Sequence, residues 1–176
     1  NETVFIRDSR GNIITEIDAE GAVLENIYDI NDNLISQTNP LGYTTEYTYD
    51  SRGNLLSATD PLGNVTRLTY GAFNQISSVT DPLGNTSLNI YDARGNLIAT
   101  TNALANTFGF EYDNQGNLIS LQDPGQNEYQ YAYNSDGLPI LMIDALGHET
   151  VYVYDDNGNQ TSISTKVTTP SCGKTL

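Results

Sequence analysis

The chain has little of what catalytic and metal-binding proteins depend on. Its 176 residues include one cysteine, one histidine, no tryptophan and seven lysines and arginines, against 22 aspartates and glutamates. A single cysteine excludes an intrachain disulfide, and with a single histidine it also excludes the usual zinc and iron–sulfur sites. The net charge of −15 disfavours nucleic acid as a partner, because phosphates would be repelled rather than neutralised. No apolar run approaches the roughly 20 residues of a membrane span, and no glycine-rich phosphate loop is present. We therefore expect no membrane insertion and no cofactor.

What the chain does have is a repeat of 21 residues. A tyrosine stands at the same position of seven successive copies, with no insertion or deletion between them. These tyrosines are Tyr28, Tyr49, Tyr70, Tyr91, Tyr112, Tyr133 and Tyr154. Arg7 takes this position in one earlier copy, so about eight copies cover almost the whole sequence. A fixed period of this kind indicates a repeat architecture rather than an ordinary globular domain.

Each copy contains two turn signals of the form Asp-x-x-Gly. In the clearest copy these are residues 50–53 (DSRG) and 60–63 (DPLG). Asp or Asn at the first position, Pro at the second and Gly at the fourth are the preferences of a type I β-turn. Fifteen such sites follow one another at alternating spacings of ten and eleven residues, and fourteen begin with Asp or Asn. Each repeat is therefore predicted to be two strands and two turns.

Glycine matters most at the fourth position of these turns, where the chain leaves with a positive φ. Eleven of the fifteen sites have it, among them Gly53, Gly63, Gly84, Gly95 and Gly116. At the same position, Asp32 and Asn74 are of residue types that tolerate a left-handed conformation. Ala105 and Gln126 are not, so we expect their two turns to depart from the pattern.

The segments between the turns predict short β-strands. Residues 44–49 (TTEYTY) and 150–154 (TVYVY) are typical, because threonine, tyrosine and valine suit a pleated sheet. Fifteen turns separate about sixteen such strands, too short to be helices, so the fold class is all-β, an antiparallel β-hairpin ribbon. Side chains alternate along a strand, so the tyrosines share one face, where we expect them to stack as a ladder. We interpret that row as packing rather than as a ligand-binding stripe.

Three copies carry a longer signature, in residues 49–55 (YDSRGNL), 91–97 (YDARGNL) and 112–118 (YDNQGNL). This signature resembles the Rhs or YD repeat. The resemblance implies a β-ribbon that spirals into a hollow shell, as in bacterial Rhs toxins, the shell subunits of insecticidal toxin complexes, and teneurins. In the toxins, the resemblance implies, the shell encloses a C-terminal toxic domain.

The repeat pattern also gives a boundary. After Asn159 the next turn should fall near Thr165, but the sequence there fits no turn signal. We therefore predict an array of about eight YD repeats over residues 1–164 and a non-repeat tail or boundary segment over residues 165–176.

Few residues could carry chemistry. His148 stands where other copies have Asn after the turn, and we interpret it as a solvent-facing turn residue. Cys172 lies in the predicted tail without a predictable partner, so the sequence indicates no catalytic dyad and no enzyme. Calcium is the more serious alternative, because it binds six to eight oxygens and aspartates recur in columns along the turns. The candidate ligands are Asp50, Asp60, Asp92 and Asp113, although turn formation already explains an aspartate at these sites.

Two hypotheses about function remain. The first is a non-enzymatic scaffold, part of a larger secreted or cell-surface bacterial shell protein, whose partners are other repeats of the shell and its enclosed cargo. The second is a binding module for carbohydrate or a surface protein. Charged strand positions such as Glu46 and Arg67 vary in sign between copies, which fits a solvated face better than a periodic ligand site. An open ribbon also has unpaired strand edges, which predict self-association.

Overall fold

The computed structural model describes residues 2–167, which form sixteen β-strands and no helix. The odd-numbered strands end at the tyrosine position: β1 Val4–Arg7, β3 Val23–Tyr28, β5 Thr44–Tyr49, β7 Val65–Tyr70, β9 Thr86–Tyr91, β11 Thr107–Tyr112, β13 Glu128–Tyr133 and β15 Glu149–Tyr154. The even-numbered strands follow the next turn in each case: β2 Ile13–Ile17, β4 Leu34–Thr38, β6 Leu55–Thr59, β8 Ile76–Thr80, β10 Leu97–Thr101, β12 Leu118–Gln122, β14 Pro139–Ile143 and β16 Gln160–Lys166. With no helix among these residues, none that could cross a membrane is found there.

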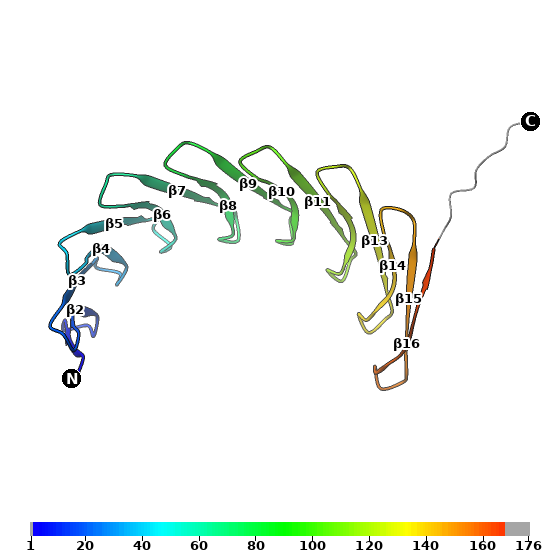
Figure 1. Cartoon of the computed structure of the whole chain (residues 1–176), viewed down its shortest axis with the longest axis horizontal. Helices are drawn as coiled ribbons and strands as arrows, with labels where there is room; N and C mark the ends of the chain where they lie inside the picture. Colours follow the sequence, from blue (N-terminus) through cyan, green and yellow to red (C-terminus); the bar gives the residue numbers. More distant parts are fainter. Residues whose placement is uncertain (1, 168–176) are drawn as a thin grey trace, which may run out of the picture. The chain divides into compact units, whose positions relative to one another are not determined.

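The sixteen strands form one open sheet whose order is the order of the sequence (Figure 1). Each strand contacts only the strand before it and the strand after it, so the sheet is one layer thick. Every strand pair whose register is described is antiparallel, as between β5 and β6. The predicted all-β array of antiparallel hairpins is confirmed. The chain divides between Leu88 and Asn89, inside β9, into unit 1 and unit 2, which are described separately below.

The two faces of the strands differ although neither encloses a core. None of the residues that the structure describes is buried. In β5, Tyr47 and Tyr49 are half-buried, whereas Glu46 and Thr48, which alternate with them, are exposed. A one-layer sheet has solvent on both sides, so its stability depends on the hydrogen bonds and side-chain contacts between neighbouring strands.

Each hairpin of an odd and the following even strand whose register is described contains a β-bulge at the tyrosine position. Between β5 and β6, Thr48 pairs with Ser57 but Tyr49 pairs with Leu55, so Leu56 has no partner in the register. The same shift occurs at Arg7, Tyr28, Tyr70, Tyr112, Tyr133 and Tyr154. The cross-strand partner of a tyrosine is therefore the first residue of the next strand. An even strand lies between successive tyrosine strands, so no tyrosine pairs with another tyrosine in the register, and the expected stacking of their side chains stays a prediction.

The hairpins that connect an even strand to the next odd strand have no such bulge. Their last pair before the turn is often two threonines, such as Thr38 and Thr44, whose hydroxyls are 2.9 Å apart. Thr80 and Thr86 repeat this contact at 2.9 Å. At the end of the array, β16 continues through Lys166, two residues beyond the predicted boundary. The rest of the predicted tail, with Cys172, lies outside the described residues.

Candidate functional site: the two edges of turns

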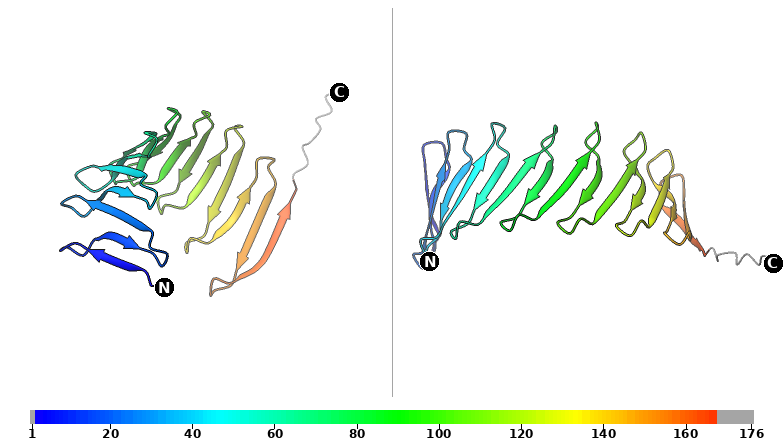
Figure 2. Two further views of the ribbon diagram at one scale, coloured as in Figure 1. Left: turned by 60° about the vertical axis from the view of Figure 1, so that its left-hand side comes forward. Right: turned by 90° about the horizontal axis from the view of Figure 1, so that it is seen from above.

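Successive strands run in opposite directions, so the turns of each unit lie alternately at two opposite edges (Figure 2). Turns after odd-numbered strands form what we name the tyrosine edge, at residues 8–11, 29–32, 50–53, 71–74, 92–95, 113–116, 134–137 and 155–158. Turns after even-numbered strands form the leucine edge, at residues 18–21, 39–42, 60–63, 81–84, 102–105, 123–126 and 144–147.

All fifteen turns close with the same two backbone hydrogen bonds. At residues 50–53, the Gly53 amide donates to the Asp50 carbonyl (3.1 Å) and the Asp50 amide donates to the Asn54 carbonyl (2.9 Å). The fourth residue has a positive φ in each turn, +84° at Gly53. Ala105 and Gln126 adopt φ of 62° and 66° and keep both bonds, so the expected departure at these two turns is wrong. An L-residue in this conformation costs roughly 1–2 kcal/mol, which the rest of the turn offsets.

The side chain of the first residue holds the turn from inside. One carboxylate oxygen of Asp50 accepts the backbone amides of Arg52 (2.8 Å) and Asn54 (2.9 Å). The other accepts the side-chain amide of Asn54 (2.9 Å). Asp60 at the leucine edge makes the same three contacts with Leu62 and Asn64, at 2.8–2.9 Å.

These contacts favour the charged form of the carboxylate. The side-chain amide of Asn54, followed by its backbone amide, holds the pKa of Asp50 below the ordinary 3.8. Asn64 does the same to the pKa of Asp60. The pKa is also lowered for Asp8, Asp29, Asp81, Asp92, Asp113, Asp123, Asp144 and Asp155.

The calcium hypothesis gains no support from this geometry. Each of the four candidates, Asp50, Asp60, Asp92 and Asp113, uses both carboxylate oxygens within its own turn. Within residues 2–167, no three His, Cys, Asp or Glu side chains come together as a metal site would require. The aspartate columns of the sequence are columns of turn formers.

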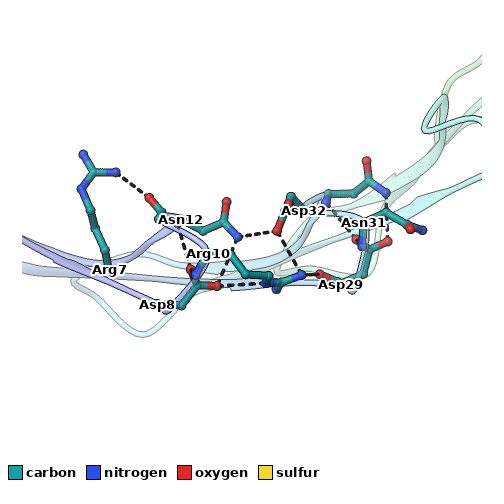
Figure 3. Close-up of polar contacts among 9 residues, drawn as sticks. Arg7, Asp8, Arg10, Asn12, Asp29, Asn31 and Asp32 are labelled. Carbon is teal, nitrogen blue, oxygen red and sulfur yellow. Dashed lines mark hydrogen bonds and ion pairs between the residues drawn. The ribbon is translucent and has the colours of Figure 1, made fainter.

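Neighbouring turns of the tyrosine edge are joined by side chains (Figure 3). Arg10 extends from the first turn to the second, where its guanidinium donates to the Asp29 carbonyl (2.8 Å) and lies 3.0 Å from the Asp32 carboxylate. The Asn12 amide donates to the same Asp32 oxygen at 2.6 Å and to Asp8 at 3.1 Å. The Asp32 carboxylate, at the fourth position of its turn, thus contacts the side chains of both Arg10 and Asn12 from the preceding turn region.

The same bridge recurs every second repeat. Arg52 donates to the side-chain oxygen of Asn74 (3.2 Å), which also accepts the amide of Asn54 (3.2 Å). In unit 2, Arg94 donates to the carbonyl of Asn114 (3.0 Å). The three arginines are spaced at 42 residues, which is twice the repeat length. A comparison of single 21-residue copies does not reveal this double period. The non-glycine residues at the fourth position of two receiving turns, Asp32 and Asn74, supply the acceptors that a glycine would lack.

The tyrosines also tie neighbouring repeats together. The hydroxyls of Tyr49, Tyr70 and Tyr154 donate to the carbonyls of Leu34, Leu55 and Pro139, each at 2.9 Å. Each acceptor begins the even strand before the tyrosine's own strand. Burial, and then the neighbouring Tyr47 and the negative charge of Asp29, raise the pKa of Tyr49. These three hydroxyls are engaged with backbone rather than directed at a ligand.

Apolar side chains are most exposed at the tips of the leucine edge. The third residue of a turn is leucine at five of its seven sites, and each of these leucines has three quarters or more of its surface exposed: Leu41, Leu62, Leu83, Leu104 and Leu146. At the tyrosine edge the exposed apolar tip residues are Ile30 (86%) and Phe73 (60%).

His148 belongs to a turn region, as predicted, but its side chain is only 26% exposed and does not face solvent freely. His148 Nδ1 lies 2.8 Å from an Asp144 carboxylate oxygen, the position that an asparagine amide takes in other copies. The backbone amide of His148, more than its ring, holds the pKa of Asp144 below 3.8. Its side chain therefore acts as a substitute for the turn asparagine.

The hollows on the surface of unit 2 are also poor in reactive groups. Two adjoining hollows are both lined by Gly109 and Gln122. Gly109 has no side chain to fill the space there. The first is lined by Glu111, Glu128 and Ser120 among others. Ser120 donates to Glu128 (3.1 Å), and neither hollow is lined by histidine, cysteine, lysine or arginine.

Comparison with known proteins agrees with this architecture. The family model for the teneurin YD-shell matches residues 2–171, and none of the curated proteins matches. Among solved structures, TcdB2-TccC3 without its hypervariable C-terminal region is 18% identical, with a TM-score of 0.51 over 93% of this chain and 11% of that chain. The Tc holotoxin pore of Photorhabdus luminescens is 18% identical, with a TM-score of 0.50 over 94% of this chain and 11% of that chain.

At these identities the two structures show a shared fold and nothing further, and this chain spans about a tenth of their length (11%). The family model, in contrast, covers nearly the whole sequence, and the repeats, turns and hairpins follow one unbroken pattern over the same residues. On this evidence the chain belongs to the teneurin YD-shell family.

Proposed function

We propose that this chain is a non-enzymatic wall segment of a secreted or cell-surface bacterial shell protein that encloses a C-terminal toxin or other cargo domain. The observation that carries the proposal is the single-layer sheet in which no described residue is buried. Such a sheet separates the space on one face from the space on the other and builds no interior of its own.

The construction of the sheet suits this role. Each repeat contacts only its neighbours in sequence, so the wall extends by adding copies without changing those already present. Arginine bridges at every second repeat and tyrosine bridges at three repeats join neighbouring copies at one edge. These features support a barrier that is continuous and uniform along the chain, and family membership supports its use as a shell.

The described residues also offer no arrangement for catalysis. A hydrolase needs a nucleophile in reach of a base, or paired carboxylates in a pocket. His148 is held by Asp144, and the turn aspartates are held by backbone and asparagine amides. We therefore assign a structural role to this chain. Any enzymatic activity of the whole protein would belong to another domain.

Protection of the cargo tests the proposal. The complete protein that contains residues 1–176, and its C-terminal domain expressed alone, would be digested with a non-specific protease at neutral pH. We expect the C-terminal domain to survive at least tenfold longer within the complete protein. As a matched control, the recognition sequence of a specific protease is inserted into the turn at residues 60–63. The uncut form has an intact wall and the cut form has a wall opened at this turn. Equal digestion rates of the free and attached domain would contradict the proposal.

A further inference from the structure

Three departures from the repeat meet at the two hollows of unit 2. Gly109, in the middle of β11, lines both hollows and is the one glycine that lies within a described strand. Ala105 and Gln126 line the second hollow, and among the described turns they alone combine a positive φ with a residue other than glycine, asparagine or aspartate. The hollows have volumes of ≈330 and ≈400 Å³, within the range of about 300–1,000 Å³ of small-molecule sites.

The fold does not require glycine at position 109. Gly109 has no positive φ, and an added Cβ would meet only the Gln122 Cβ, at 3.9 Å, which is an ordinary contact. Equivalent positions hold larger residues, such as Glu46 in β5 and Val151 in β15. Glycine weakens a strand and often marks a place where a ligand or another backbone approaches closely. Within residues 2–167 each strand contacts only its sequence neighbours, so a ligand is the remaining explanation.

The two turns beside Gly109 have an unfavourable backbone. Ala105 and Gln126 have φ of 62° and 66°, a region that costs an L-residue free energy. The other five turns of the leucine edge have glycine at this position. Non-glycine residues held in this region concentrate at ligand-binding sites. At position 126 the residue supplies a carboxamide that a glycine would lack, and this carboxamide has no hydrogen-bond partner in the part of the chain that the structure describes.

Polar side chains surround the first hollow on one face of the sheet. Gly109 pairs with Gln122, which in turn pairs with Glu128. Glu111 pairs with Ser120 in the same register, and directly paired side chains share a face. The side chains of Glu111 and Gln122 have no hydrogen-bond partner within residues 2–167. Both depart from the repeat, because β4, β6, β8 and β10 end in threonine where β12 ends in Gln122, and no other copy has an acidic residue at the position of Glu111.

We infer that these two hollows form a binding groove for an uncharged oligosaccharide. Sugar hydroxyls donate and accept hydrogen bonds, and carboxylates, carboxamides and hydroxyls offer the matching groups. The apolar lining, Ile98 and Phe110 in the first hollow and Pro124 in the second, suits the C–H face of a sugar ring. Because Gly109 and Gln122 line both hollows, one chain of linked rings can occupy the two together. A site here does not depend on whether the sheet encloses a cargo.

Charged ligands fit this groove less well. An anion would meet Glu111, Glu128 and Asp123, with no lysine, arginine or histidine in the lining of either hollow. A small cation needs several free oxygens together. Asp123 uses both carboxylate oxygens within its own turn region, and one oxygen of Glu128 already accepts two hydrogen bonds. No three His, Cys, Asp or Glu side chains come together in residues 2–167. An uncharged ligand avoids both difficulties.

Saturation-transfer NMR with the full chain tests the inference. The probes are the neutral trisaccharides of glucose, mannose, galactose and N-acetylglucosamine, each at millimolar concentration. We expect saturation transfer to at least one of them, and its titration then gives a dissociation constant.

Variants that restore the residues of other repeats locate the site. Gly109→Val places a side chain in the groove and should weaken binding at least tenfold, while the urea midpoint should not fall because valine favours a strand more than glycine does. Gln122→Thr removes a free carboxamide and should weaken binding at least threefold. The matched control is Glu46→Val, at the equivalent position of unit 1, which should leave the dissociation constant unchanged.

Several outcomes would overturn the inference. Saturation transfer to none of the four trisaccharides leaves the groove without this class of ligand. Equal affinity of Gly109→Val and the wild-type chain, or an equal loss in Glu46→Val, places binding elsewhere on the sheet. Displacement of the bound trisaccharide by trilysine at a lower concentration assigns the groove to cations. A fall in the urea midpoint of Gly109→Val would mean that the fold itself requires the glycine.

Discussion

The turns of the tyrosine edge and the leucine edge share a backbone and differ in what their tips do. At both edges the first residue accepts amides from within the turn and the fourth adopts a positive φ. The second and third positions are then free to vary. At the tyrosine edge they provide arginines that hold the next turn, and at the leucine edge they provide leucines that face solvent. The tips of the tyrosine edge include side chains bonded to neighbouring turns, whereas the tips of the leucine edge expose leucine side chains to solvent.

This difference separates two requirements of a repeat wall. A one-layer array has no core, so neighbouring repeats must be held together by contacts along the array. The tyrosine edge supplies these contacts through side chains that reach the next or previous repeat. At the leucine edge the turns at residues 39–42, 60–63 and 81–84 are likewise closed from within, and their leucine tips are exposed to solvent.

The largest effect we expect is acid unfolding, which acts on both edges together. Ten aspartates have a pKa below 3.8 in the folded chain. A lowered folded-state pKa adds stability that is complete above the unfolded value and is lost as pH falls through the folded value. The urea midpoint should therefore be constant near pH 6 and fall steeply below pH 3.8. An unchanged midpoint at pH 2.5 would contradict the carboxylate contacts.

The turn backbone should respond equally at the two edges. Gly53→Ala and Gly63→Ala each place a Cβ at a φ of 84° or 82°, which costs roughly 1–2 kcal/mol of the free energy of unfolding. The added Cβ would meet nothing within 4 Å at Gly63 and only the Asn33 side chain, at 3.5 Å, at Gly53. Urea unfolding measures both. As the reverse control, Ala105→Gly should stabilise by a similar amount, and a loss of stability there would contradict the positive φ.

Tyrosine hydroxyls should matter at one edge only. Tyr70→Phe removes the hydrogen bond to the Leu55 carbonyl and should cost about 0.5–1.5 kcal/mol of the free energy of unfolding. Tyr43 follows a turn of the leucine edge and is 54% exposed, so Tyr43→Phe should change stability by less than about 0.5 kcal/mol. If the two variants lose the same stability in urea, the hydroxyl bridge does not stabilise the array.

The smallest effects concern the tips themselves. Arg52→Ala removes an exposed contact with Asn74 and should cost at most about 1 kcal/mol. Leu62→Ser should change the stability of the monomer by less than about 0.5 kcal/mol, because the leucine is 85% exposed. Thermal unfolding at a low protein concentration compares the two. A larger loss for Leu62→Ser would mean that the leucine packs within its own chain.

Much of the fold could be predicted from the sequence because the turns are local. Residues 50–54 contain every group that closes this turn, so one repeat is enough to recognise it. The strands between such turns had to be short and antiparallel. For the same reason the fifteen turns and the sixteen strands in the described residues agree with the sequence pattern.

What could not be predicted depends on the exact pairing of the strands and on how one hairpin lies against the next. The bulge at Tyr49 shifts the register of its hairpin by one residue, so that the tyrosine pairs with Leu55 instead of Leu56. The contact between Arg52 and Asn74 joins residues 22 positions apart. Ala105 was misjudged because the other turn bonds fix its φ. The exposure of the leucines likewise follows from the single layer, which no one repeat reveals.

The central claim is that residues 1–176 are part of a wall around a cargo domain, and cryo-electron microscopy of the complete protein tests it most directly. We predict a closed shell in which this sheet has one face toward the interior and separate density for a C-terminal domain lies within. A map in which the array stands apart from any enclosed space, with solvent on both faces, would contradict the account.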